Sequence, residues 1–263
     1  MMLKSLLGRL INGALASSGR ELRRKHDPSA LLRTIGLATV IDGGANDGGF
    51  ASCIREVSPS AAIHSFEPVP WLYKALADRF KGDGNFCSYA LALGEANHEA
   101  EFEINTDSYS SSLLPIDDGA AAFFPGLNRS SVIRVPVTTL DTWATDRDLP
   151  RPLLLKLDLE GNELAALRGA TQLLKQVDYI LAEINFVLLR QGQPSFHEVE
   201  KFLAEHGFEV MDVYPGHQDK RTGRSIWSDV LFGSIDPISQ TTLDAPRDQA
   251  RNNGHDRKSP SPS

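Results

Sequence analysis

A glycine-rich turn between residues 40 and 50 carries the residue types best suited to bind a charged ligand. It reads Val-Ile-Asp-Gly-Gly-Ala-Asn-Asp-Gly-Gly-Phe. Glycine has no Cβ, so this backbone can turn sharply and lie close to a ligand. The spacing is not the dinucleotide fingerprint G-x-G-x-x-G, and its two acids would repel a pyrophosphate. They would attract a cation such as S-adenosylmethionine, which carries an ammonium and a sulfonium group. We therefore expect this cofactor to contact Asp42, Gly43, Gly44, Ala45, Asn46, Asp47 and Gly48.

A third acid, Glu67, ends the next predicted strand and is followed by Pro68. Ligands of open α/β sheets bind at the carboxyl ends of the strands, where such an acid can accept hydrogen bonds from both hydroxyls of a ribose. Ala90 and Leu91 follow the third predicted strand and would supply small and apolar groups near an adenine ring. The glycine-rich turn and Glu67 together predict a bound nucleoside.

Charged residues also interrupt the apolar strand at 153–157. Lys156 and Asp158 lie at its exit, where a buried charge is unfavourable unless it is paired or functional. We expect Asp158 to contact the cofactor and to be the catalytic residue, as a general base or as a metal ligand. The structural alternative is a salt bridge with Lys156 beside a helix-capping cluster that includes Glu163, and for Glu163 we favour that alternative.

The end of the following strand carries Glu183 and Asn185. If this strand is the neighbour of 153–157, then Asp158, Glu183 and Asn185 lie on one rim, where their oxygen atoms could hold Mg²⁺ with open positions for a substrate. Glu183 could instead only hydrogen-bond the backbone or the substrate. The sequence leaves both possibilities open.

Strands and helices alternate along the chain, which predicts a parallel, doubly wound α/β sheet. The expected strands are 38–41, 62–66, 85–90, 153–157 and 179–184, and the expected helices are 29–37, 50–57, 70–80, 161–175 and 195–206. Residues 208–214 and 226–232 are expected to form an antiparallel hairpin at the sheet edge. Between strands predicted at 100–104 and 131–137 lies a long polar segment of the kind that forms lids. Its residues Tyr109, Ser111 and Ser112, with Glu183 and Asn185, are candidate substrate contacts.

Composition limits the possible partners. The chain has 263 residues, of which 41% are hydrophobic and 23% charged, as in ordinary soluble proteins. A net charge of −7 disfavours nucleic acid as a partner. Cys53 and Cys87 have no metal-type spacing, which predicts two free, buried thiols in a reducing cytoplasm.

The chain is expected to divide into a helical extension at 1–34, a catalytic domain at 35–235 and a disordered tail at 236–263. Leucines recur at helical spacing in the basic first segment, and no apolar run is long enough to span a bilayer. That helix would pack on the domain or on a partner, or would touch a membrane surface peripherally. The oligomeric state cannot be inferred from the sequence.

Several segments together resemble the FkbM family of methyltransferases, a class I S-adenosylmethionine-dependent group. The resemblance covers residues 38–234, and its motifs are Ile41–Gly48, Phe66–Pro68, Ser111–Leu113, Leu155–Leu164, Leu167–Ala170 and Asp229–Phe232. It implies a Rossmann-like three-layer sandwich around a seven-stranded, mostly parallel sheet with an antiparallel last strand. The chain departs from the family pattern at Gly43, where Val is usual, and at Asn162, where an aromatic residue is common.

By the same resemblance, Asp158 matches the acid at a strand end, and the cofactor positions are Asp42, Gly44, Asn46, Asp47, Glu67 and Ala90. The activity that it implies is O-methylation of a hydroxyl on a sugar, polysaccharide, glycolipid or natural product, with a small molecule or glycan as the acceptor. Two other functions remain to be weighed: a binding module that holds S-adenosylmethionine without catalysis, and a nicotinamide-dependent oxidoreductase, which the absent G-x-G-x-x-G disfavours.

Overall fold

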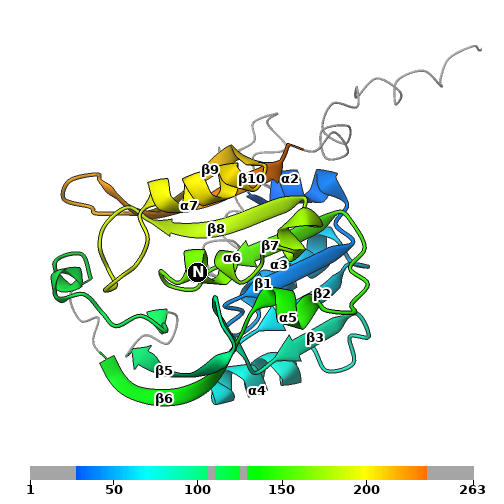
Figure 1. Cartoon of the computed structure of the whole chain (residues 1–263), viewed down its shortest axis with the longest axis horizontal. Helices are drawn as coiled ribbons and strands as arrows, with labels where there is room; N and C mark the ends of the chain where they lie inside the picture. Colours follow the sequence, from blue (N-terminus) through cyan, green and yellow to red (C-terminus); the bar gives the residue numbers. More distant parts are fainter. Residues whose placement is uncertain (1–27, 106–109, 125–128, 236–263) are drawn as a thin grey trace, which may run out of the picture.

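A computed structural model of the chain describes residues 28–105, 110–124 and 129–235 (Figure 1). Within them, seven strands form a central sheet in the order β3-β2-β1-β7-β8-β10-β9. The strands are β1 (Thr39–Gly43), β2 (Ala62–Phe66), β3 (Phe86–Tyr89), β7 (Leu153–Leu157), β8 (Tyr179–Asn185), β9 (Phe208–Gln218) and β10 (Ser225–Ser234).

The sheet is parallel from β3 to β8, and β10 is antiparallel to both of its neighbours. The last strand in the sequence is therefore the antiparallel one, and it inserts between β8 and the edge strand β9. This topology confirms the predicted α/β fold with a seven-stranded, mostly parallel sheet. The expected hairpin exists, although its second strand lies inside the sheet.

Helices cover both faces of the sheet: α2 (Pro28–Ile35), α3 (Gly49–Val57), α4 (Pro70–Arg79), α5 (Leu140–Ala144), α6 (Glu163–Arg168) and α7 (Phe196–Glu205) (Figure 1). Successive residues of a strand point to opposite faces, and β7 shows the effect. Leu154 packs in one core cluster with Ile54 of α3, whereas Leu155 packs in the other with Leu203 of α7. Burial on both faces explains why β7 is apolar almost throughout.

Helix α2 lies across the expected boundary between residues 34 and 35. Its Leu32 and Ile35 are buried in the same cluster as Ala51 and Ile54 of α3. The expected extension therefore ends in a helix that packs on the domain. The amphipathic helix expected before residue 27 and the tail after 235 lie outside the described residues.

A smaller sheet contains β4 (Ala92–Leu93), β5 (His98–Asn105) and β6 (Arg129–Thr138), in the order β4-β6-β5. Its apolar side includes Phe102 and Val135, which cluster with Val69 at the start of α4. A 3₁₀ helix, η2 (Asp118–Ala122), lies in the segment between β5 and β6. This segment corresponds to the expected lid, of which 106–109 and 125–128 lie outside the described residues.

The expected helix at 161–175 was wrong in its second half. Helix α6 ends at Arg168, and a short 3₁₀ helix, η3 (Leu173–Lys175), follows. Gly169 lies so close to Gly94 that a Cβ there would be 2.2 Å from the Gly94 carbonyl oxygen. The Asp141 carboxylate then accepts the N–H groups of Gln172 and Leu173, at 3.0 and 2.8 Å, and so caps a new turn.

Cys53 and Cys87 form no disulfide in the described part of the chain, as predicted, but both are exposed, so their expected burial was wrong. Cys53 lies on α3 and Cys87 on β3, a sheet edge. Among the described helices, none combines the length and the apolar character that crossing a bilayer requires.

Candidate functional site

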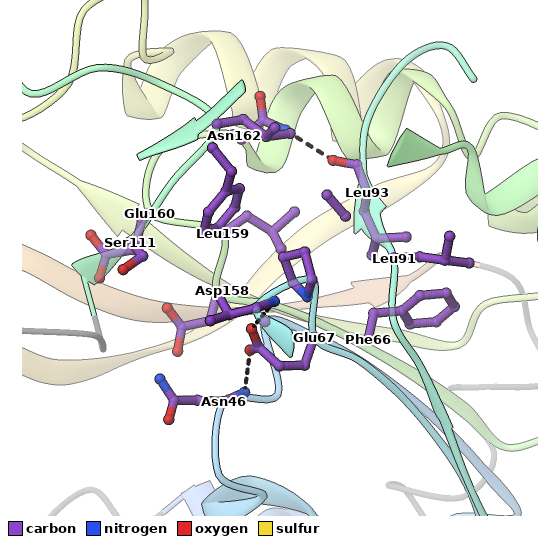
Figure 2. A pocket seen from close by; sticks show the side chains of 16 residues that line it. Asn46, Phe66, Glu67, Leu91, Leu93, Ser111, Asp158, Leu159, Glu160 and Asn162 are labelled. Atoms are coloured by element: carbon purple, nitrogen blue, oxygen red, sulfur yellow. Dashed lines mark hydrogen bonds between the residues drawn. The ribbon is translucent and has the colours of Figure 1, made fainter. Parts of the chain in front are cut away.

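A pocket opens at the carboxyl ends of β1, β2 and β7 (Figure 2), where ligands bind in open α/β sheets. Its wall is formed by residues at these strand ends, by residues of β4 and β5, and by the Ser111–Leu113 segment. They are Gly44, Asn46, Phe66, Glu67, Pro68, Val69, Leu91, Ala92, Leu93, Phe102, Ser111, Leu113, Asp158, Leu159, Glu160 and Asn162.

Several residues of the pocket have unusual backbone conformations. Gly44 has a φ of +76°, and a Cβ on it would lie 1.9 Å from the Asp158 carbonyl oxygen, so only glycine lets the two loops touch. Asn46 and Glu160 also adopt positive φ, at +49° and +54°. Such strained residues are concentrated at functional sites. Of the three non-glycine residues with positive φ in the described part of the chain, these two line the pocket.

Glu67 is the best-defined acceptor in the pocket. Its Oε2 accepts the N–H of Asn46 at 2.8 Å, and its Oε1 accepts the N–H of Val69 at 2.9 Å (Figure 2). Each carboxylate oxygen can accept a further hydrogen bond, so both remain able to bind a hydroxyl. Burial raises the pKa of Glu67 to about 7, although the two N–H groups oppose the shift.

Asp42 forms a buried ion pair with Lys156. Asp42 is fully buried, and its Oδ1 lies 3.1 Å from the Lys156 Nζ. The register explains the pair, because Asp42 of β1 and Lys156 of β7 are direct neighbours across the two parallel strands. Burial opposes the charge on Lys156, but Asp42 and Asp158 outweigh this effect and raise its pKa. The Lys156 Nζ also approaches the Gly44 carbonyl oxygen, at 3.0 Å.

Both acids of the glycine-rich turn have cationic partners within the chain. Lys156 neutralises Asp42, which is not among the residues that line the pocket. Asp47 likewise has a protein partner, since its Oδ2 lies 3.4 Å from the Arg79 Nη1. The predicted attraction of a cationic ligand by these two acids is therefore weakened by lysine and arginine of the same chain.

Asp158, Glu160 and Glu183 form a cluster of carboxylates, each with one oxygen within 4.8 Å of the others. Asp158 is 39% exposed, and its Oδ2 lies 3.5 Å from the Lys156 Nζ. Burial, with help from the neighbouring carboxylates, raises the pKa of both Glu160 and Glu183. Like charges this close cannot all ionise at neutral pH, so the cluster retains protons or binds a cation.

Two further acids surround the cluster. Glu163 accepts the N–H groups of Leu159 and Gly161, at 2.8 and 3.1 Å, so it is bound to the loop that precedes α6. This is a structural role, as expected, but not a helix cap, because α6 has no side-chain cap hydrogen bond. Burial raises the pKa of Glu163 to about 7. Asp229 lies directly across from Glu183 in the β8–β10 register, and burial followed by the charge of Asp158 raises its pKa to about 6.

Seven of the candidate residues predicted from the sequence line the pocket: Gly44, Asn46, Glu67, Pro68, Leu91, Ser111 and Asp158. Nine others lie outside its wall: Asp42, Gly43, Ala45, Asp47, Gly48, Ala90, Ser112, Glu183 and Asn185. Tyr109 lies outside the described residues.

Ser112 is buried and donates to the Glu160 carbonyl oxygen at 3.0 Å, so it holds the strained loop in place. For the expected Mg²⁺ ligands, the structure brings Asp158 and Glu183 together with Glu160. Asn185 is not in that set, although it is buried and its Oδ1 has no hydrogen-bond partner in the described part of the chain.

Much of the wall was not predicted. The missed residues are mainly apolar: Phe66, Val69, Ala92, Leu93, Phe102, Leu113 and Leu159, with Glu160 and Asn162. Asn162 donates its side-chain N–H to the Leu93 carbonyl oxygen at 2.9 Å and so ties β4 to the α6 loop (Figure 2). No local pattern separates such residues from ordinary core. Glu160 was the exception, because it is a third charged residue close after Lys156 and Asp158 in the sequence.

Comparison with known proteins places this site in context. A hexuronic acid methyltransferase of Haloferax volcanii is 26% identical over 145 residues, which span 55% of this chain and 54% of that protein. The chain thus matches about half the length of this relative.

Two solved structures are also similar. A Methyltransferase FkbM from Methylobacillus flagellatus shares 16% identity, with 75% of this chain and 44% of that chain covered and a TM-score of 0.48. Aeropyrum pernix fibrillarin with bound S-adenosyl-L-methionine shares 16% identity, with 87% and 74% covered and a TM-score of 0.43.

The model of the Methyltransferase FkbM domain matches residues 42–210, from the buried aspartate of β1 to the start of β9. This match covers more than half of the chain and includes the glycine-rich turn, Glu67, the carboxylate cluster and the segment between β5 and β6. The chain belongs to the FkbM methyltransferase family.

Proposed function

We propose that this protein transfers a methyl group from S-adenosylmethionine to a hydroxyl of a sugar, a polysaccharide or glycolipid, or a natural product. The observation that carries the proposal is Glu67, which lines the pocket and whose two oxygens are fixed by backbone N–H groups. A nucleoside with two ribose hydroxyls satisfies this arrangement, and the apolar wall beside it suits an adenine ring.

We infer the direction in which the cofactor lies from the residues at the two ends of the pocket. Glu67, Phe66 and Leu91 favour the nucleoside at one end, whereas Ser111 and Glu160 lie together at another (Figure 2). Asp158 lies between Glu160 and Asn46 in this view, so the methyl group would be delivered near it. Methyl transfer is an in-line displacement at carbon, for which alignment of donor and acceptor is the main requirement.

Asp158 is the proposed general base. As the acceptor oxygen bonds to the methyl carbon, the carbon–sulfur bond breaks, and the hydroxyl proton passes to the Asp158 carboxylate. The products are the methyl ether, neutral S-adenosylhomocysteine and a protonated carboxyl. Lys156, 3.5 Å from Asp158, fixes the position of that carboxylate.

A sugar acceptor is supported by the relative from Haloferax volcanii, whose name specifies hexuronic acid. Cys53 and Cys87 are exposed and form no disulfide within the described residues, which supports a reducing, cytoplasmic setting. The net charge of −7 disfavours a nucleic acid acceptor.

A methyl-transfer assay tests the proposal. The full chain is incubated with S-adenosylmethionine labelled on the methyl group and a panel of neutral and acidic saccharides, and products are detected by mass spectrometry. We expect one class of saccharide to gain a methyl group. Replacement Asp158→Asn should lower turnover by about 10²- to 10⁴-fold, the usual contribution of a general base. Asp148→Asn, an exposed acid outside the pocket wall, is the matched control. Cofactor binding without transfer to any saccharide would instead indicate a binding module.

Mg²⁺ is a second candidate for activating the hydroxyl, because Asp158, Glu160 and Glu183 offer one carboxylate oxygen each. A bound ion would lower the pKa of the hydroxyl directly. Turnover that falls after chelation and returns with added Mg²⁺ would support the ion, whereas turnover unaffected by chelator would leave Asp158 as the base.

A further inference from the structure

Arg190 is a buried arginine that the reaction above does not use. It follows β8 in the apolar run Val187-Leu-Leu-Arg190, and the residue is 1% exposed. Its backbone is held on two sides: it bridges Ile116, and its N–H donates to the Gln193 Oε1 at 2.8 Å. The position of the side chain is therefore fixed by the fold.

The guanidinium of Arg190 is only partly satisfied. Its Nη2 donates to the Ser110 carbonyl oxygen and lies 3.5 Å from the Glu160 Oε2. Its Nε and Nη1 are buried and have no hydrogen-bond partner among the residues that the structure describes. Buried polar groups are nearly always paired, and an unpaired charged donor is especially costly. The free donors therefore indicate a ligand that accepts hydrogen bonds.

These donors lie directly behind one end of the pocket. Ser111, the residue after Ser110, and Glu160 both line that end and lie side by side in Figure 2. The Nη2 of Arg190 contacts Glu160 and Ser110, so the guanidinium lies behind residues of the pocket wall at the end assigned to the acceptor.

The charges around Arg190 favour an anion. Glu160 is its one carboxylate neighbour within 4.0 Å among the described residues. That contact is 3.5 Å long, whereas a close charge-assisted hydrogen bond is about 2.7–2.9 Å. The guanidinium therefore keeps the capacity to bind a closer anion.

We propose that Arg190 binds a carboxylate of the methyl acceptor, and that the acceptor is an acidic sugar. The inference rests on the proposed function, because it names the substrate class of the same pocket. The acceptor carboxylate replaces Glu160, whose side chain is 19% exposed and whose 3.5 Å contact with Arg190 is long. One carboxylate thus exchanges for another, and the guanidinium gains short, charge-assisted hydrogen bonds.

Saccharide binding to the full chain, loaded with S-adenosylhomocysteine, tests this inference by ligand-observed NMR titration. The probes are D-glucuronate, D-glucuronamide, D-glucose and glucose 6-phosphate. We expect glucuronate to bind at least tenfold more tightly than the amide and glucose, which differ from it in charge. Equal affinities, or no binding of glucuronate, would overturn the proposal. Glucose 6-phosphate that binds as tightly as glucuronate would overturn the choice of a carboxylate over other anions.

Two variants are expected to change the preference for glucuronate over glucuronamide in opposite directions. Arg190→Met should abolish the preference for glucuronate, whereas Glu160→Gln should keep or increase it, because a competing carboxylate is removed. The control is Arg221→Met, an arginine whose side chain is 83% exposed at the β9–β10 turn. A purely structural Arg190 would not produce this reversal. An Arg190→Met protein that binds S-adenosylhomocysteine normally and retains the preference overturns the proposal.

The comparison of glucuronate with glucuronamide uses the unmodified chain, so it stands even if Arg190→Met fails to fold. Cofactor binding is titrated separately. Failure of the wild-type chain to bind S-adenosylhomocysteine would count against the proposed function, whereas normal cofactor binding without a preference for glucuronate would count against the role of Arg190 alone.

Discussion

Replacement of Lys156 by methionine should strongly destabilise the protein. Methionine retains much of the aliphatic length of lysine but removes the charge that neutralises Asp42. Asp42 is fully buried, and its Oδ1 lies 3.1 Å from the Lys156 Nζ. Removal of one partner of a buried ion pair leaves an uncompensated charge and typically costs about 3–5 kcal/mol. Since a domain is stable by only about 5–15 kcal/mol, Lys156→Met should remain folded but much weakened.

The second half of this experiment removes both charges. In Asp42→Asn/Lys156→Met no buried charge is left without a partner, so the double variant should lose less stability than the sum of the two single variants. We expect a coupling energy of roughly 1–3 kcal/mol, as for residues in direct contact. Urea unfolding of the four proteins, with unchanged m-values, measures these free energies.

Two results would refute the reasoning. A loss below about 1 kcal/mol for Lys156→Met would mean that Asp42 does not depend on this lysine. Additive losses in the double variant would mean that the two residues act independently. Tighter binding of S-adenosylmethionine to Lys156→Met would further indicate that Asp42 attracts the cofactor directly once its partner is removed.

Three further predictions concern other parts of the site. Gly44→Ala should lose about 2–5 kcal/mol of stability, measured by urea unfolding, and most of its cofactor affinity, because the new Cβ would meet the Asp158 carbonyl oxygen. The control is Gly192→Ala, which has a similar φ but open space around the new Cβ, and it should lose only about 1 kcal/mol. Folding raises the pKa of Glu67 to about 7, so above pH 4.5 the native state holds a proton that the unfolded state has lost. The free energy of unfolding without cofactor should therefore fall as the pH rises from 4.5 to 7. Glu67→Gln should reduce this pH dependence, and an unchanged dependence would contradict its attribution to Glu67. Asp141→Ala should cost about 1 kcal/mol through loss of the cap on η3 without altering cofactor affinity, and a binding defect would show that this cap reaches the site.

The regular strands were predictable because their patterns are local. Ala62–Phe66 and Leu153–Leu157 have the bounds that the sequence predicted, since turn residues flank each apolar run. The glycine-rich turn was also recognisable, because its acids and glycines are contiguous. Glu67 could be placed at the end of β2 for the same reason.

Contacts between distant segments were beyond prediction. The pairing of Asp42 with Lys156 depends on which strands are neighbours and in what register. The break in α6 occurs where Gly169 lies against Gly94, a contact between distant segments that no local pattern reveals. Arg190 offered one signal, a charge within an apolar run, the same signal that drew attention to Lys156.

Binding of S-adenosylhomocysteine to the purified chain, measured by isothermal titration calorimetry, tests the central claim most directly. One molecule should bind per chain. Glu67→Gln should weaken binding at least about tenfold, because a charge-assisted hydrogen bond is worth roughly 1.5–3 kcal/mol. Asp148→Asn should bind like the wild type. No binding by the wild-type chain, or equal binding by Glu67→Gln, would contradict the assignment of this pocket to the cofactor.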